Sequence, residues 1–367
     1  MESNNNSCRV AHLVNRMGYG VAAGDLTKAL NQHTEFESTV ISLQEPSGIP
    51  DGVPVRYLND SELSSRISLK KISWLHNTLD KFDLITAHHT FAGLFGGFIG
   101  KVQKKPLVAR EGNNHQKFPI KVRVARAITG LLADQIVCVS QSVADSYTGF
   151  EQIISKSKFE VITNGVNLEA VQSAETNDWS IHSVADIDSE AFVVGTVGML
   201  TEQKNHETLL RSVKRLRSER SLNIELVIAG DGPQFEYLND LARDLGISQV
   251  VHFLGYLNRE QVYKTLHEIN CYAMPSRWEG FSAAALQAMA AGVPCVFSDI
   301  PSFSSQYPND IARFHNPESI SELAEALYQA LKTDKELGDR GSKFVSNNHS
   351  IKKMAKEYSE IYRQVIS

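Results

Sequence analysis

The chain has 367 residues, an apolar fraction of 42%, a charged fraction of 22% and a formal net charge of −5. This length suits two domains of ordinary size, and the acidic balance gives no reason to expect a nucleic-acid partner. The N-terminal residues MESNNNSCRV lack the basic and apolar regions of a signal peptide, and no window approaches 18 consecutive apolar residues. We therefore expect a cytoplasmic protein without a transmembrane helix.

Short apolar runs alternate with longer amphipathic ones along the chain. Strands are predicted at residues 9–14, 38–43, 53–58, 83–88, 106–110, 135–139 and 159–163, and again at 192–197, 224–229, 250–254, 271–274 and 293–297. Strand–helix alternation is typical of parallel sheets covered by helices, and two such series predict an α/β chain of two Rossmann-like domains. The predicted domains are residues 1–170 and 191–350, joined by a polar linker at 171–190.

The cysteines and the last helix complete this outline. Cys138, Cys271 and Cys295 lie in apolar strand-like runs without metal-ligand spacing, so we expect them to be reduced and buried. Near the C-terminus, Met354, Tyr358, Ile361 and Val365 recur every three or four residues, which predicts an amphipathic helix at 351–366.

The segment at residues 274–294 combines a strand, a loop and a helix. A buried strand ends near Met274, and an Ala-rich helix is predicted from Phe281 to residue 291, where Gly292 ends it. In parallel sheets ligands bind at the carboxyl ends of the strands, and a helix N-terminus there suits a diphosphate. Glu279 stands just before this helix, where it can face a sugar.

This segment resembles the E-x7-E element of retaining glycosyltransferases of family 4, which have the GT-B fold. The matching letters are PS-x-x-EGF at 275–281 and Q-AMA-x-G-x-P at 287–294. The resemblance implies that Glu279 contacts the transferred sugar and that Gln287, in place of the second Glu, bonds the nucleotide ribose through its amide oxygen. It also implies that two domains face each other across a cleft, and that the C-terminal helix (351–367) returns to the first domain.

Other segments are similar to the same family, in the same order. Residues 197–205 resemble its GRL-x-x-x-KG loop, which implies that Lys204 binds the donor diphosphate and that Met199 occupies the position of the family's Arg. Residues 226–233 resemble its G-x-GP turn, and residues 251–256 its V-x-F-x-G segment. The donor-binding residues implied by these matches are Gly232, Leu254, Gly280, Phe281 and Ser282.

In the first domain, a glycine-rich turn follows the first strand. Gly18 and Gly20 belong to G-x-G-x-x-x-G spacing, which could indicate a dinucleotide site, but in the family this turn lies near the donor phosphate. His88 and His89 are similar to the family's H-x-H and are candidates for sugar contact. Glu111 and Asn113 follow the strand after which the family often carries a histidine, and they are candidate acceptor-side residues.

Two charged segments have alternative interpretations. Residues 101–126, from Lys101 to Arg126, hold eight Lys and Arg against one acid, and resemble the basic surface by which such enzymes touch anionic membrane. The alternative is a solvated face. Asp186 and Asp188 spell the metal-binding DxD of the other large glycosyltransferase fold, but we interpret them as part of an acidic loop in the linker.

The resemblance implies a retaining glycosyltransferase that moves a sugar from a nucleotide-diphosphate sugar to a saccharide or lipid-linked acceptor. We expect UDP rather than GDP, no metal and no cofactor, and a cytoplasmic protein that can also lie on the inner face of the membrane. Two alternatives remain. One is a nucleotide-sugar epimerase on the same fold, and the other is a non-catalytic binding subunit, because Met199 and Gln287 depart from the family pattern.

Overall fold

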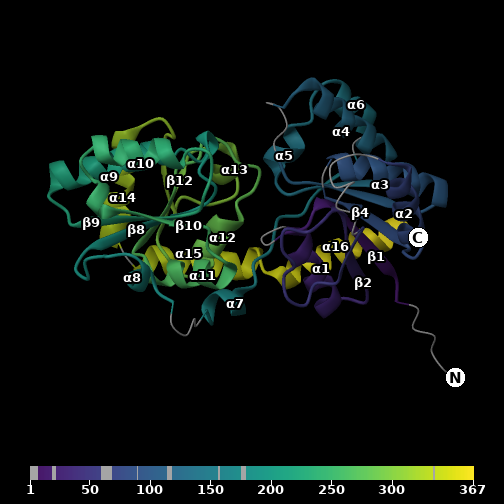
Figure 1. Ribbon diagram of the computed structural model, residues 1–367, viewed down its shortest axis with the longest axis horizontal. Coiled ribbons are helices and arrows are strands. Elements are labelled where there is room, and N and C mark those ends of the chain that lie inside the picture. Colours follow the sequence, from purple (N-terminus) through teal and green to yellow (C-terminus); the bar gives the residue numbers. More distant parts are fainter. Residues whose placement is uncertain are drawn as a thin grey trace. The chain divides into compact units, whose positions relative to one another are not determined.

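The computed structural model of the chain describes residues 7–18, 22–58, 68–88, 90–113, 118–155, 158–174, 179–333 and 335–367. They form two compact units (Figure 1). The first unit comprises Met1–Asn164 and Ile351–Ser367, and the second comprises Gly165–Ser350. The main chain therefore leaves the first unit once and returns to it for the last helix.

The first unit contains a parallel sheet of seven strands in the order β3-β2-β1-β4-β5-β6-β7. Its strands are β1 (Arg9–Arg16), β2 (Glu37–Gln44), β3 (Val55–Tyr57), β4 (Leu84–Ala87), β5 (Leu107–Glu111), β6 (Gln135–Cys138) and β7 (Phe159–Val161). Its helices are α1 (Ala22–His33), α2 (Leu69–Leu79), α3 (Thr90–Gln103), α4 (Ile120–Leu132), α5 (Gln141–Asp145), α6 (Phe150–Ser155) and α16 (Ile351–Ile366). The central strands are buried on both faces, as parallel sheets require.

Helix α16 packs beside α1 in the first unit, as the resemblance implied. Its apolar stripe buries Met354, Tyr358 and Tyr362 in a core that also contains Leu26 and Leu30 of α1. The Tyr362 hydroxyl accepts a hydrogen bond of 2.8 Å from Thr86, deep in the unit. The last helix of the chain therefore completes the core of the first unit.

The second unit contains a parallel sheet of six strands in the order β10-β9-β8-β11-β12-β13. Its strands are β8 (Phe192–Val197), β9 (Ile224–Ala229), β10 (Val251–Gly255), β11 (Cys271–Met274), β12 (Cys295–Ser298) and β13 (Arg313–His315). Its helices are α7 (Leu168–Gln172), α8 (Ile181–Val184), η2 (Glu202–Lys204), α9 (His206–Arg220), α10 (Phe235–Asp244), η3 (Ser248–Val250), α11 (Arg259–Glu268), α12 (Ala283–Ala290), α13 (Pro301–Ser304), α14 (Ile320–Thr333) and α15 (Lys335–Asn348). The sequence missed β13, because its three residues, RFH, carry too short an apolar pattern.

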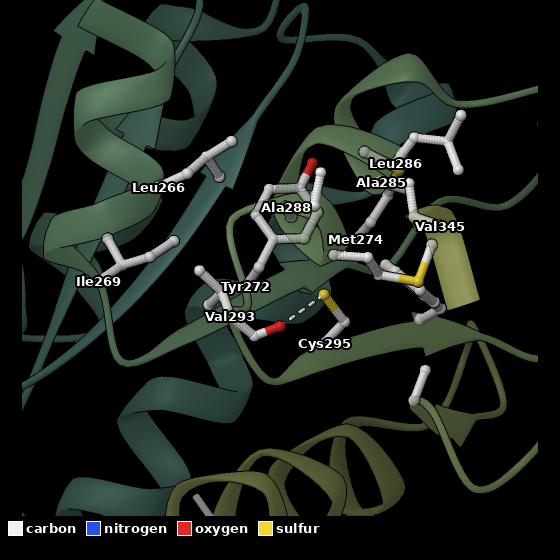
Figure 2. Close-up of a cluster of buried hydrophobic side chains, with 14 of the residues drawn as sticks. Leu266, Ile269, Tyr272, Met274, Ala285, Leu286, Ala288, Val293, Cys295 and Val345 are labelled. Carbon is white, nitrogen blue, oxygen red and sulfur yellow. Dashed lines mark hydrogen bonds between the residues drawn. The ribbon is translucent and has the colours of Figure 1, made fainter. Parts of the chain in front are cut away.

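The core beneath β11 and α12 is tightly filled (Figure 2). Tyr272 and Met274 of β11 point into the same cluster as Ala285 and Ala288 of α12. The thiol of Cys295 lies 3.1 Å from the carbonyl oxygen of Val293. Small Ala side chains let α12 approach the sheet closely, so this core fixes the helix that begins beside Glu279. As predicted, the three cysteines in strand-like runs are free and buried.

The segment predicted as a linker, residues 171–190, is part of the second unit. Its described residues include α8, and they contribute Val171, Ile181 and Ile187 to the buried core of that unit. These three apolar residues are widely spaced in a polar stretch, so the sequence shows no helix or strand periodicity there. The structure divides the chain between Asn164 and Gly165, six residues before the expected boundary at 170.

Candidate active site

Lys204 and Glu279 form a nearly buried ion pair in the second unit. Strands β8 and β11 are neighbours in the sheet, so the loops that follow their carboxyl ends meet. Lys204 ends η2 in the first loop, and Glu279 lies in the second. The Nζ atom of Lys204 donates to Oε1 of Glu279 at 2.6 Å, with 19% and 6% of the two side chains exposed. Two of the four residues predicted to be catalytic are thus in direct contact.

Ser276 fixes the orientation of the Glu279 carboxylate. Its hydroxyl donates to the same Oε1 atom of Glu279 at 2.8 Å, and Ser276 is fully buried. Two donors on one carboxylate oxygen fix the orientation of the carboxylate and leave Oε2 for other partners. Sequence reasoning did not assign Ser276 a role, although it lies in the quoted motif.

Asn205 links the loop that carries Lys204 to the loop that carries Glu279 and to a third loop, which contains Pro317. It has left-handed backbone, with φ of 55°, at the position where the resembled motif has Gly. Its buried side chain donates through Nδ2 to the carbonyl oxygens of Pro275, at 3.1 Å, and Pro317, at 2.7 Å. Its Oδ1 accepts from Thr208 at 2.9 Å. Asn tolerates this conformation better than other non-Gly residues, so the substitution adds a clamp next to Lys204.

A buried histidine follows this clamp. His206 is 1% exposed, and burial together with the nearby Lys204 charge lowers its pKa to about 4. The imidazole is therefore neutral at pH 7 and adds no second positive charge beside Lys204.

Glycines pack the turns after β8 and β9 against each other. A Cβ atom at Gly230, whose φ is +146°, would lie 1.9 Å from the carbonyl oxygen of Gly198. A Cβ atom at Gly232 would lie 2.6 Å from the carbonyl oxygen of Leu200. Gly232 was predicted as a donor-binding residue, and the structure gives it a packing role: it lets the turn support the loop that carries Lys204.

Helix α12 begins at this site, as the sequence predicted. Ser282 is its N-cap and accepts from the amide of Ala285 at 3.2 Å. The side chain of Ser282 is buried and engaged in capping, while Gly280 is buried and Phe281 is half-buried against the core. Gln287, one turn further along the helix, is half-exposed. The free amide groups of the first helical turn suit an anion.

Two other predicted donor residues, and Arg277 in the loop before α12, have different surroundings. Met199 is 63% exposed on the loop after β8, and Leu254 is half-buried against the core of the unit. Arg277 donates from Nε to Glu318 at 2.8 Å and from Nη1 to the carbonyl oxygen of Glu202 at 2.9 Å. Arg277 thus ties the loops together, and its charge is offset by a carboxylate.

The DxD letters form no metal site in the described part of the chain. Asp188 accepts from the side chain of Asn223 at 2.7 Å and from the amide of Glu190, and these bonds lower its pKa. Its own amide donates to Glu225, so Asp188 is a structural residue of the loop before β8. Among the residues that the structure describes, no three His, Cys, Asp or Glu side chains are grouped as metal ligands require.

The candidate residues of the first unit lie at the ends of its strands. His88 follows β4, is 3% exposed, and its Nε2 lies 2.9 Å from Nδ1 of His12. Burial, with a smaller effect of Arg110, lowers the pKa of His12 to about 3, so His12 is a neutral imidazole at pH 7. The position of His88 in the buried pair gives it structural contacts that the sequence did not suggest.

The other predicted residues of the first unit have mixed outcomes. Glu111 ends β5 and is 3% exposed, whereas Asn113 is exposed. At Gly18 a Cβ atom would meet Ser47 Oγ at 2.6 Å, so this glycine serves a close approach. His89 and Gly20 lie outside the described residues.

Several cations of residues 101–126 bind within the first unit, so only part of the predicted basic surface is exposed. Arg126 is fully buried, donates to Oε1 of Glu151 at 3.0 Å and stacks on Tyr147. Arg123 donates to Oε2 of the same Glu151 at 2.8 Å. Lys105 bonds the carbonyl oxygen of Leu79 at 2.8 Å. The sequence could not reveal these partners, because Glu151 lies outside the basic segment. Lys117 lies outside the described residues.

Family models match both units. Residues 18–170 match the model described as Glycosyltransferase Family 4, and residues 177–347 match the one described as Glycosyl transferases group 1. The chain belongs to this glycosyltransferase family, and its two Rossmann-like units have the GT-B fold. None of the described helices is long and apolar enough to cross a membrane.

Individual relatives are distant. An uncharacterized glycosyltransferase of Methanocaldococcus jannaschii is 26% identical over 300 residues, which are 78% of this chain and 76% of the relative. An Escherichia coli UDP-Gal:alpha-D-GlcNAc-diphosphoundecaprenol alpha-1,3-galactosyltransferase is 24% identical over 65% of this chain and 62% of its own length. The Anabaena HepE structure in complex with UDP and glucose has a TM-score of 0.79 at 17% identity, over 97% of this chain and 100% of that one. At that identity the likeness shows the fold alone.

Proposed function

We propose that this chain is a retaining glycosyltransferase that uses a UDP-sugar and a saccharide or lipid-linked saccharide acceptor. The observation that carries the proposal is the Lys204–Glu279 ion pair at the carboxyl ends of two adjacent parallel strands. Open parallel sheets bind their ligands at this edge. A cation and a carboxylate held together there suit a substrate that has a diphosphate beside a sugar.

The reaction breaks the bond between the anomeric carbon and the donor diphosphate, and forms a bond from that carbon to an acceptor oxygen. Negative charge grows on the departing phosphate, and stabilising it is the main task of the protein. Lys204 supplies a positive charge, and the first amides of α12 supply a positive dipole end. The acceptor proton passes to the phosphate oxygen of the donor, so no strong side-chain base is needed.

In this scheme Glu279 contacts the transferred sugar. Its carboxylate is held by Ser276 and Lys204 through one oxygen, which leaves Oε2 for a sugar hydroxyl. Gln287 is proposed to bond the ribose, and Glu111 and Asn113 to serve the acceptor side. Lys204 and the positive dipole end of α12 balance the negative charge of the departing diphosphate, so the proposal includes no metal and no cofactor.

Two relatives support the choice of substrates. The name of the Escherichia coli relative specifies a UDP-sugar donor and a sugar linked to a lipid diphosphate, and the Anabaena structure holds UDP and glucose. We therefore place UDP ahead of GDP, and a lipid-linked saccharide among the acceptors. The particular sugar is left to experiment.

A donor screen tests the proposal. The purified chain is mixed with a panel of UDP- and GDP-sugars, and its melting temperature and the release of nucleotide are measured with and without saccharide acceptors. We expect one UDP-sugar to raise the melting temperature, by mass action, and to be consumed when acceptor is present. The anomeric configuration of the product, from its proton spectrum, then decides between retention and inversion.

A non-catalytic binding subunit is the second candidate. Met199 and Gln287 stand where the resembled family has Arg and Glu, and both changes remove charge from the donor site. A chain that binds a UDP-sugar but never transfers or hydrolyses it would favour this candidate. Turnover of the donor sugar without any acceptor would instead favour an epimerase.

A further inference from the structure

Arg110 is a buried cation of the first unit whose charge no carboxylate balances. It is the next-to-last residue of β5 and is 7% exposed. Its Nη2 atom donates to Oδ1 of Asn164, and among the described residues no Asp or Glu forms an ion pair with it. A buried charge is costly unless an opposite charge or a ligand compensates it. Arg126 in the same unit has such a partner in Glu151, and Arg110 does not.

The carboxylate next to Arg110 in the sequence points away from it. Glu111 follows Arg110 in β5, and neighbouring residues of a strand point to opposite faces of the sheet. Burial, and after it the charge of Glu111, raises the pKa of Tyr147, so Glu111 faces the side of the sheet on which Tyr147 lies. Burial raises the pKa of Tyr358 in α16 to about 12, against an opposing effect of the Arg110 charge. Arg110 therefore faces α16, and Glu111 does not neutralise it.

The groups that face Arg110 on the α16 side are uncharged. Burial, and to a smaller extent the charge of Arg110, lowers the pKa of His12 to about 3, so this imidazole is neutral at pH 7. The Tyr358 phenol and the Asn164 amide are also neutral. In the described part of this cluster, an anion would thus meet a guanidinium and no acid.

The guanidinium of Arg110 is open on one side. A Cβ atom at Gly112 would lie 3.7 Å from Nη1 of Arg110, so a larger residue at position 112 would cover this nitrogen. Among the described residues, the fully enclosed polar atoms without a hydrogen bond include no nitrogen of Arg110. The donors that Asn164 leaves unused therefore reach the surface of the unit. They do so at the carboxyl end of a parallel strand, where such sheets bind their ligands.

We propose that Arg110 binds a phosphate group of the acceptor. A guanidinium presents its donors as a planar fork that matches two oxygens of a phosphate, and its charge strengthens both hydrogen bonds. The inference rests on the proposed transferase function and names the chemistry of its acceptor, which is a saccharide with a phosphate or diphosphate ester. The donor diphosphate is assigned to Lys204 and α12 in the second unit, so the acceptor is the source of the phosphate that Arg110 binds.

Thermal-shift titration of the full chain with inorganic pyrophosphate tests the proposal. Saturating UDP is present throughout to fill the donor site, so a further rise in melting temperature reports a second anion site. The unmodified chain should show this rise, and Arg110→Met should bind pyrophosphate about 10-fold or more weakly, because it loses charged hydrogen bonds. Gly112→Leu keeps the charge but covers Nη1, and it should also weaken pyrophosphate binding. The affinity for UDP should be unchanged in both variants.

A matched variant separates anion binding from the loss of a cation in general. Arg56→Met removes an exposed cation from β3 of the same unit and should bind pyrophosphate as the unmodified chain does. Without ligand, the melting temperature of Arg110→Met should fall little, because the cation it removes has no buried carboxylate partner.

Three results would overturn the proposal. The first is equal pyrophosphate affinity in the unmodified chain, Arg110→Met and Gly112→Leu. The second is displacement of pyrophosphate by UDP together with weaker UDP binding in Arg110→Met, which would assign the phosphate to the donor. The third is tighter binding of glucuronate than of pyrophosphate, which would make the ligand a carboxylate. If no nucleotide binds at all, the proposed function fails, and the comparison of pyrophosphate binding between the variants still decides the anion site.

Discussion

The helices that cover the two sheets differ in the side chains that they expose to solvent: charged pairs in the second unit and apolar side chains in the first. In the second unit, α9 carries ion pairs along its exposed side: Arg211 with Glu207 at 3.0 Å, and Arg215 with Glu219 at 2.9 Å. Arg220 extends this pairing to Glu325 of α14 at 2.8 Å. In the first unit, α3 and α4 expose Phe, Ile, Val and Leu side chains instead.

The packing of a helix on a sheet does not decide which side chains its outer surface carries. Both helix pairs bury an apolar stripe, and only α3 and α4 repeat it on the side away from the sheet. A helix that is apolar all round needs a second apolar partner. We propose donor chemistry for loops of the second unit, so variants on the outer sides of α3 and α4 should leave donor binding unchanged.

The largest effect should come from removing the cation of the donor site. Lys204→Met should lower turnover by about 100-fold or more, because it removes a preorganised charge that stabilises the departing diphosphate. Nucleotide release measures turnover, and Arg215→Met, which removes an exposed cation from α9, serves as the matched control. Near-normal turnover of Lys204→Met would place the active site elsewhere.

The ion pair should behave as one unit. Glu279→Gln keeps the acceptor for Ser276 but removes the charge, and should also cost about 100-fold in turnover. The double variant Lys204→Met/Glu279→Gln should then lose little more than either single variant, since groups that act together are not additive. Rate constants for the four proteins of this cycle are compared, and multiplication of the two single effects would show that the residues act independently.

A smaller effect is expected from the Asn205 clamp. Asn205→Gly retains the left-handed backbone but loses the bonds to Pro275 and Pro317, so the Lys204 loop should be less ordered and kcat should fall about 10-fold. Ser221→Gly is the control, because Ser221 has a similar φ of 51° at the end of α9 and is remote from the ion pair in the sequence. If both variants lose activity equally, the effect comes from backbone freedom.

Gln287→Glu should change donor affinity only slightly. A carboxylate accepts a stronger hydrogen bond from a ribose hydroxyl than an amide oxygen does, so UDP should bind roughly threefold more tightly. Calorimetric titration with UDP measures this, and Gln364→Glu, which changes an exposed side chain of α16, controls for added negative charge. Weaker UDP binding in the Gln287 variant alone would argue against ribose contact.

The smallest effect should follow chelation. Turnover in excess EDTA should equal turnover in buffer, because the proposed diphosphate site relies on Lys204 and the amides at the start of α12. Loss of activity that Mn²⁺ or Mg²⁺ restores would contradict this charge balance.

The sequence predicted the strand, the helix and the candidate residues of the site, but not the contacts that hold them in place. Strand β11, helix α12 and the pair Lys204 and Glu279 follow from local patterns and motifs. The contacts of Asn205 could not be predicted, because its side chain bonds carbonyl groups 70 and 112 residues away. A contact with a distant residue leaves no local signal in the sequence. Asn205 stands where the resembled motif has Gly, so in the sequence it looks like a simple loss of glycine.

The surface of the first unit was also beyond local patterns. The cations of residues 101–126 predict a basic surface, yet Arg126 is fully buried and pairs with Glu151, 25 residues further on. In α3 the apolar residues occur on both sides of the helix, so periodicity alone could not tell which side faces the sheet. The glycines decide this, because only their side allows the close approach to Thr129 and Leu132.

The return of the chain to its first unit constrains how the protein can be recombined. Truncation at residue 350 would leave a fragment without α16 and would expose Leu26 and Leu30, so that fragment should aggregate. A chimera that exchanges donor specificity between relatives must instead insert residues 165–350 as a cassette between two retained ends. A single crossover in the gene between the two units would separate α16 from the core that it completes. The two units should therefore be inherited together.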